Sequence, residues 1–155
     1  MLHAVRNAWD PMAARGVPPH VTVLFPFIQA EALTPEVHTA LAAISTSNPP
    51  FTARFGRVEH VDTMIWLVPT EQEPFLRLTA SVAGRWPDHP PNGGVHAELV
   101  AHLTVLDGNE GEALREAENA VKQAVPFDAS VDALEVIAED DAGRWHVRWR
   151  LPLGS

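Results

Sequence analysis

The chain has 155 residues, of which 46% are hydrophobic and 20% are charged, and this composition suits one globular domain. Its formal net charge of −9 excludes wrapping of long duplex nucleic acid, which needs several Lys or Arg on phosphates, but leaves room for a small anionic ligand or an RNA end. The chain has no Cys, which excludes disulfides and thiolate chemistry, and it shows neither a signal peptide nor a membrane-length apolar run, so we expect a cytoplasmic protein without a membrane partner.

Helices and extended segments alternate along the chain. Thr34 is the expected N-cap, with Pro35 in the first turn of the helix that follows it. In chain order the sequence predicts a short helix (2–9), a Pro-rich approach (16–19), a strand (20–25), a helix (35–45), an antiparallel strand pair (51–61 and 64–69), a helix (74–85), a loop (86–94), a strand (101–107), a helix (110–124) and two extended segments (127–138 and 144–151).

The strand over 20–25 has a near copy later in the chain. Residues 20–24 read HVTVL, and residues 102–106 read HLTVL. Both copies occupy the same place in an order of strand, helix, strand, strand that occurs twice, which favours a duplicated α+β fold. Side chains alternate across a strand, so His20 shares a face with Thr22, and the second copy predicts the same arrangement.

These two H-x-T motifs resemble the signature of the two-histidine (2H) phosphoesterases, and most closely their 2′-5′ RNA ligase-like branch. The resemblance covers nearly the whole chain. It rests on WDPMAARGVPPHVTVLFPF (9–27), GRVEHVDTMIWLVP (56–69), HPPNGGVHAELVAHLTVLD (89–107) and GRWHVRWRLPLG (143–154).

The resemblance implies one bilobal domain over residues 1–155, related by a pseudo-two-fold axis, with two antiparallel sheets facing a central cleft and helices outside. One lobe would carry the first motif and the other lobe the second. His20 and His102 would be the acid–base pair, and Thr22 and Thr104 would bind phosphate. Such a site hydrolyses 2′,3′-cyclic phosphates without a metal or other cofactor, because one imidazole takes a proton from water and the other protonates the leaving ribose oxygen.

The sequence departs from this family in two places. Members carry a strand before the first helix, whereas only nine residues precede Asp10 here, so either the lobe lacks a strand or the natural chain begins earlier. A missing strand would leave an open sheet edge, through which two copies could form a homodimer. Ala101 also stands where Pro is expected, a change that removes no reacting group.

Weaker candidates surround the motifs. Phe25 and Phe27 can stack on a base, although core packing is the simpler role for both. Arg148 is the preferred phosphate contact among the Arg residues of the last strand, which strict alternation places opposite Trp145 and Trp149. The six other His residues (3, 38, 60, 89, 96 and 146) show no metal-ligand spacing; His96 has a loop or surface role as its simplest interpretation.

The leading hypothesis is therefore a metal-independent phosphoesterase that acts on cyclic phosphates of small nucleotides or RNA ends. A second possibility within the family is 2′-5′ phosphodiesterase or RNA end-joining activity. A different class is a nucleotide-binding module without catalysis, and a third is a scaffold that dimerises through a sheet edge. Both His and both Thr argue for catalysis, because a pure binder does not need two proton-transfer groups.

Overall fold

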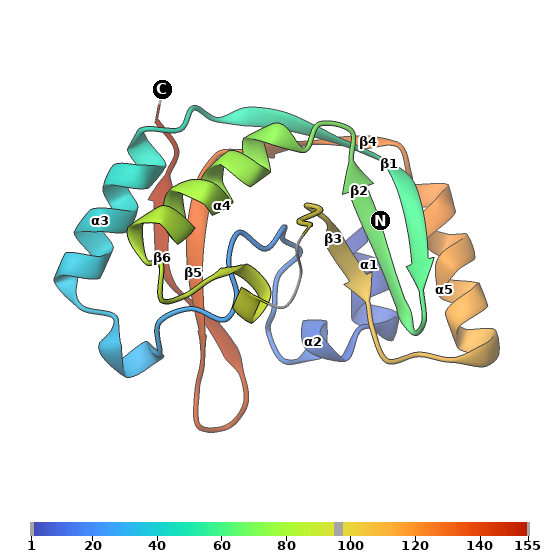
Figure 1. The fold of residues 1–155 in the computed structure, drawn as a ribbon. Coiled ribbons are helices and arrows are strands. Elements are labelled where there is room, and N and C mark those ends of the chain that lie inside the picture. The colour runs from blue at the N-terminus through green and yellow to red at the C-terminus, as the bar shows by residue number, and fades with distance from the viewer. Residues whose placement is uncertain (1, 95–97, 155) are drawn as a thin grey trace.

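The computed structural model describes residues 2–94 and 98–154, which form an α+β fold with two antiparallel sheets. Figure 1 shows the elements in order. They are α1 (Leu2–Trp9), α2 (Pro11–Ala14), the 3-10 turn η1 (Ala30–Ala32), α3 (Pro35–Thr46), β1 (Phe51–Val61), β2 (Met64–Pro69), α4 (Glu73–Arg85), η2 (Pro91–Gly94), β3 (Leu103–Leu106), α5 (Gly111–Ala124), β4 (Phe127–Val131), β5 (Ala133–Glu139) and β6 (Trp145–Pro152).

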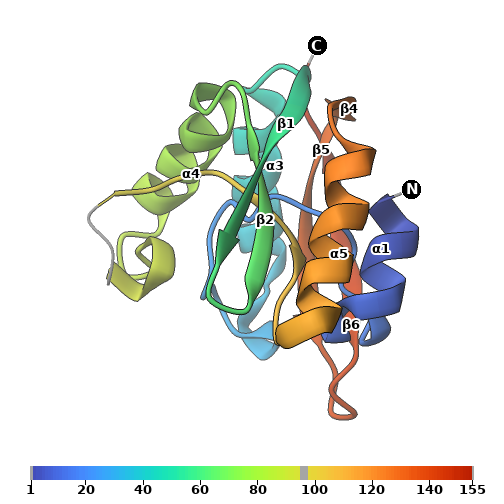
Figure 2. The same ribbon diagram turned by 90° about the vertical axis from the view of Figure 1, so that its right-hand side faces the viewer.

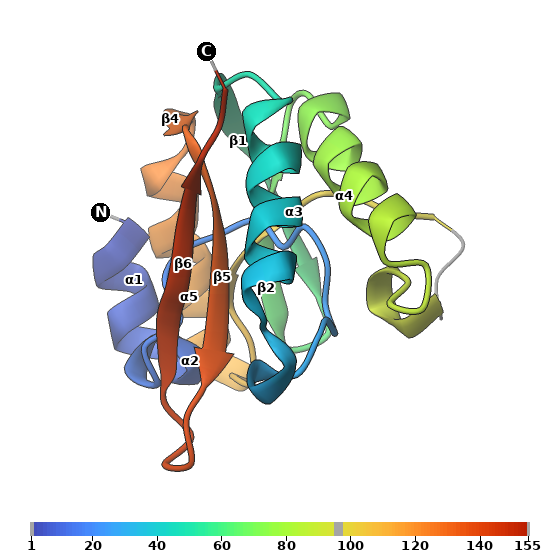
Figure 3. The same cartoon turned by 90° about the vertical axis from the view of Figure 1, so that its left-hand side faces the viewer.

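The four-stranded sheet has the order β3-β2-β1-β4, and β5 and β6 form a separate two-stranded sheet. Helices α1 and α5 lie side by side against the larger sheet (Figure 2). Helix α3 packs against β6, and α4 packs against α3 (Figure 3). Two cores result. The larger one joins residues such as Val5, Leu67 and Leu114, and the smaller one joins α3 and α4 to the hairpin through Leu41, Val82, Leu134 and Leu151.

Most of the predicted helices and strands are confirmed to within one or two residues. Thr34 caps α3, because its Oγ1 accepts a hydrogen bond from the backbone N–H of Val37 at 3.4 Å, and Pro35 is the first residue of the helix. None of the helices in the two described ranges is long and apolar enough to cross a membrane.

The predicted strand over 20–25 is wrong. This segment makes a single antiparallel bridge, between Val21 and Leu103, and no continuous ladder. Pro18, Pro19 and Pro26 flank it and have no backbone N–H for a ladder. Other partners satisfy its carbonyl groups instead: the Val23 oxygen accepts from Thr79 Oγ1 at 2.7 Å, and the Phe25 oxygen accepts from the Asn92 N–H at 3.0 Å.

The predicted extended segment 127–138 is divided at Asp132. Its first part, β4, pairs with β1 in the larger sheet, and its second part, β5, pairs with β6. The hairpin of β1 and β2 follows the first motif in the chain, yet it pairs with β3, which carries the second motif. The larger sheet has β3 and β4 at its edges, and homodimerisation through a sheet edge stays a prediction.

Candidate functional site

A buried ion pair holds the approach to the first motif. Arg6 and Asp10 lie one helical turn apart and are 4% and 3% exposed, with 2.8 Å between Arg6 Nη2 and Asp10 Oδ2. Arg6 Nη1 also donates to the Val17 carbonyl oxygen at 2.9 Å, and Asp10 Oδ1 accepts from the Met12 N–H. The pair therefore ties α1 to the chain three residues before His20. Spacing of i, i+4 on a helix was the sequence signal for this pair.

The tip of the β5–β6 hairpin holds the same approach from the other side. The Trp145 N–H donates to the Arg15 carbonyl oxygen at 2.7 Å, and the Arg15 guanidinium contacts Glu139 and the Gly143 oxygen. Gly16 has a positive φ of 96°, and a Cβ atom there would lie 2.6 Å from the Trp145 oxygen. Only glycine fits this close approach without strain.

The second motif leads into β3, which pairs with β2 and has one register shift, at Val105. Leu103 and Val105 are buried in the larger core, so the alternating residues His102 and Thr104 lie on the opposite face of β3. Trp66 on β2 pairs with Thr104 and shares this face. Its indole lies against the His102 imidazole, with ring centroids 4.1 Å apart, and its Nε1–H donates to Glu59 Oε2 at 2.7 Å. The sequence contains no local signal for this contact, because Trp66 and His102 are far apart along the chain.

The two motifs run antiparallel and meet at their middle residues, Val21 and Leu103; we call this meeting point the crossing. The Val21–Leu103 bridge is antiparallel, and both side chains pack in the larger core. Residues that flank an antiparallel bridge point away from the side of its central pair, so both His and both Thr lie on the opposite face. In an antiparallel arrangement His20 lies toward Thr104 and Thr22 toward His102, and Thr22 and His102 do line one cavity. The crossing brings together the four predicted residues: His20, Thr22, His102 and Thr104.

Both imidazoles are held in the same way. The Nδ1 atom of His20 lies 2.8 Å from the Pro18 carbonyl oxygen, and Nδ1 of His102 lies 2.8 Å from the Val100 oxygen. A carbonyl only accepts, so Nδ1 carries a hydrogen in both rings and Nε2 is left for chemistry. In the first motif Nε2 lies 3.1 Å from Thr22 Oγ1, which donates to it when the ring is neutral.

The electrostatic surroundings favour a neutral His20. Burial lowers the pKa of His20, because surrounding protein atoms remove water from the ring and so disfavour its charged form. Part of the residue nevertheless stays exposed to solvent. The Pro18 oxygen opposes this shift, the charges of Arg6 and His102 lower the pKa further, and Asp10 raises it. The net effect is a downward shift, so His20 can accept a proton near neutral pH.

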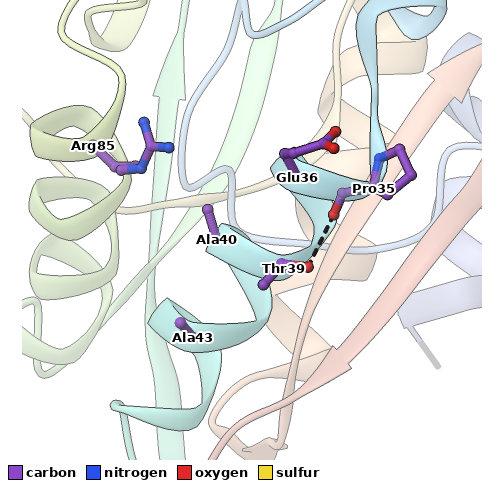
Figure 4. Close-up of a pocket in the computed structure, with 6 residues that line it drawn as sticks. All are labelled: Pro35, Glu36, Thr39, Ala40, Ala43 and Arg85. Carbon is purple, nitrogen blue, oxygen red and sulfur yellow. Dashed lines mark hydrogen bonds between the residues drawn. The ribbon is translucent and has the colours of Figure 1, made fainter.

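A small cavity of about 60 Å³ opens beside the crossing, between the first motif and the residues that lead into β3. Thr22, Phe25, Leu76, Asn92 and His102 are among the residues that line it. A larger cavity of about 420 Å³ lies elsewhere, between α3 and α4 (Figure 4). Its lining contains none of the predicted site residues and consists of Pro35, Glu36, Thr39, Ala40, Ala43 and Arg85.

The two aromatic candidates, Phe25 and Phe27, lie in different surroundings. Phe25 is 59% exposed at the cavity of the crossing, so it is free to contact a ligand. Phe27 instead packs edge-on against Trp86, with centroids 5.2 Å apart, and belongs to the smaller core.

The predicted alternation of the last strand is wrong. A register shift between Val136 and Ile137 leaves the exposed Arg148 without a cross-strand partner, so Trp149 pairs with Val136 on one face and Trp145 pairs with Glu139 on the other. The bulge therefore places the two Trp residues on opposite faces.

Four of the six other His residues have contacts of their own. His38 packs on Trp149, His89 on Phe27, and His60 and His146 contact carboxylates. His96 lies outside the described residues. Within ranges 2–94 and 98–154, no three His, Asp or Glu side chains gather as metal ligands.

Comparisons with known proteins agree on this architecture. Residues 2–143 match the family model described as the 2′-5′ RNA ligase superfamily. A crystal structure of TT0787 of Thermus thermophilus is similar in fold, with a TM-score of 0.57 and 20% identity over 98% of this chain and 93% of that one. A comparison with curated protein sequences gave no match.

Proposed function

Because this chain belongs to the 2′-5′ RNA ligase superfamily, we propose that it hydrolyses 2′,3′-cyclic phosphates of small nucleotides or RNA ends. The observation that supports this most directly is the antiparallel crossing of the two motifs, which gathers two imidazoles and two hydroxyls on one face. In-line displacement at phosphorus needs a proton acceptor and a proton donor, and two His residues whose Nδ1 atoms are held by backbone carbonyls can supply both through Nε2.

In the proposed mechanism His20 is the general base and His102 the general acid. Neutral His20 takes a proton from water through Nε2 while the water oxygen forms a bond to phosphorus. The bond between phosphorus and one ribose oxygen breaks, and the Nε2 proton of His102 passes to that oxygen. The lowered pKa of His20 favours this assignment.

The two Thr hydroxyls are proposed to donate hydrogen bonds to the non-bridging phosphate oxygens, whose negative charge must be stabilised as water attacks. Thr22 donates to His20 Nε2 in the free protein, so substrate binding requires its hydroxyl to turn toward phosphate. Phe25, exposed at the neighbouring cavity, is the candidate contact for the rest of the substrate.

The test is incubation of the purified protein with the four 2′,3′-cyclic nucleoside monophosphates in EDTA, beside His20→Ala and His102→Ala. We expect each variant to lose about 10²- to 10⁴-fold in kcat/KM, the range typical of one general acid or base. His146→Ala is the matched control, because His146 is exposed near the hairpin tip and contacts Asp140. The isomer that forms identifies the leaving oxygen.

Two outcomes would contradict the proposal. Turnover that survives both substitutions would place the chemistry elsewhere, and tight nucleotide binding without turnover would favour the binding module. Conversion of 2′-5′-linked oligonucleotides, with cyclic phosphates left intact, would favour the phosphodiesterase or end-joining activity of the same family.

A further inference from the structure

Gln72, between β2 and α4, makes an unusually complete contact with the backbone that precedes the second motif. The Ala101 N–H donates to Gln72 Oε1 at 2.6 Å, and Gln72 Nε2 donates to the Ala101 oxygen at 3.0 Å. The same Nε2 lies 3.4 Å from the Pro69 oxygen at the end of β2. Complementary donors and acceptors at Ala101 fix which way the side-chain amide faces.

We propose that Gln72 is the positioning residue of His102. Ala101 is only 7% exposed, and β3 begins at Leu103, so no strand ladder reaches the Ala101 peptide groups. Buried backbone groups need partners, and the Gln72 amide supplies them at the point where a neighbouring strand does not. The inference rests on the proposed function in so far as it takes His102 to be a reacting group.

The effect on His102 passes through a single peptide group. The Ala101 N–H and the Val100 carbonyl belong to the same planar peptide unit, in which the N–H and C=O point in opposite directions. Gln72 holds the N–H end, and the carbonyl at the other end accepts the hydrogen on His102 Nδ1 at 2.8 Å. Fixing one end of this unit therefore fixes the carbonyl that sets the tautomer and direction of the imidazole.

Gln72 is itself held in place. It is half-buried, and its carbonyl oxygen accepts from the Leu76 N–H at 3.1 Å in the first turn of α4. Phe75, one turn along, is 5% exposed and belongs to the larger core. The contact thus links the rigid start of α4 to the second motif, and a flexible surface side chain would not give the same restraint.

The experiment compares Gln72→Met with the wild type. Met fills a similar volume but forms neither bond. We expect kcat on the best cyclic nucleotide to fall about 10- to 100-fold with KM within about twofold, because a small displacement of a reacting group costs this much in rate. Gln123→Met, an equal change at an exposed site on α5, is the control and should leave both constants unchanged.

NMR separates positioning from general destabilisation. In Gln72→Met we expect the Ala101 amide to exchange about tenfold faster or more and the imidazole nitrogens of His102 to lose the single Nδ1–H tautomer. The amide of Leu67, a buried residue of β2 paired on both sides, should keep its protection. An unchanged kcat, or equal acceleration of all amides, would overturn the inference. If the wild type turns over no cyclic nucleotide, the proposed function fails on its own, and unchanged Ala101 and His102 signals in the variant would still refute positioning by Gln72.

Discussion

The two motifs have nearly the same sequence but are supported by different means. The first, around His20, follows two Pro residues and makes one bridge, and its hydroxyl is already bonded to its imidazole. The second, around His102, leads into a strand that pairs with β2 through three residues, and its imidazole lies on the Trp66 indole.

The carbonyl that orients each imidazole shows the contrast most clearly. For His20 it belongs to the Pro18–Pro19 unit, which has no N–H to satisfy and whose rings restrict the backbone. For His102 it belongs to the Val100–Ala101 unit, whose N–H needs Gln72. One motif is thus held by local covalent stiffness and an ion pair nearby, and the other by a side chain from another element. Substitutions in the two supports should therefore behave differently.

The largest effect is expected from the ion pair beside the first motif. Arg6→Met leaves Asp10 charged and unpaired in a buried position, which should lower the free energy of unfolding by about 3–5 kcal/mol. Urea denaturation measures this loss. Adding Asp10→Asn removes the orphaned charge and should restore most of the stability. A double variant as unstable as the single one would mean that Arg6 acts through its bond to Val17 rather than through the charge pair.

The next largest effect is expected at Gly16, which precedes the first motif and lies close to Trp145 of the β5–β6 hairpin. Gly16→Ala should lower the free energy of unfolding by about 2–4 kcal/mol, because the positive φ and the close Trp145 oxygen are both unfavourable for a residue with a Cβ atom. Gly108→Ala is the matched control, since its φ of 91° is similar but no atom lies within 4 Å of the added Cβ. We expect thermal unfolding to show the smaller loss for Gly108→Ala, and equal losses would exclude the contact with Trp145.

A smaller difference is expected between the Thr residues. Thr22→Val should lower kcat on a cyclic nucleotide by about 1,000-fold and Thr104→Val by about 100-fold, the two ends of the range for loss of one donor to developing charge. Thr22 has the larger effect because its hydroxyl also contacts His20 Nε2, whereas the Thr104 hydroxyl makes no hydrogen bond within residues 2–94 and 98–154. Steady-state kinetics decides the order, and a larger loss at Thr104 would reverse the comparison.

The smallest effect is the dependence of stability on pH. The folded protein holds His20 below its unfolded pKa of about 6.5, so the unfolded state binds the proton more tightly. Well above pH 6.5 the His20 ring is neutral in the folded and the unfolded state, so its protonation does not affect the free energy of unfolding. As pH falls below 6.5 and through the folded pKa, His20 should lower the stability, and His20→Gln should remove that part of the loss. Denaturation at pH 5 to 8 measures it; parallel curves for both proteins would show no such linkage.

Most of the helices and strands, and the four candidate site residues, could be predicted from the sequence. Helical spacing and a Thr-Pro cap predicted α3, and the repeat of H-x-T identified the four residues that the crossing brings together. These features are local, because they depend on side chains within a few positions of one another. The predicted strand over 20–25 failed for a non-local reason: its β-forming residues have the right propensity, but Pro residues and bonds to Thr79 and Asn92 leave it without a ladder.

How the two motifs meet, and which residues support them, follows from tertiary packing. The chain order of strands does not reveal that the hairpin after the first motif pairs with the second motif, or that β6 bulges at Arg148 and turns Trp145 away from Trp149. Gln72 and Trp66 have no sequence signal at all, because their contacts with Ala101 and His102 join segments about thirty residues apart or more. The local pattern of residues was enough to predict the candidate reacting groups. Their orientation depends on the packing of distant segments, since a hydrogen bond or ring contact forms only where the folded chain brings both partners together.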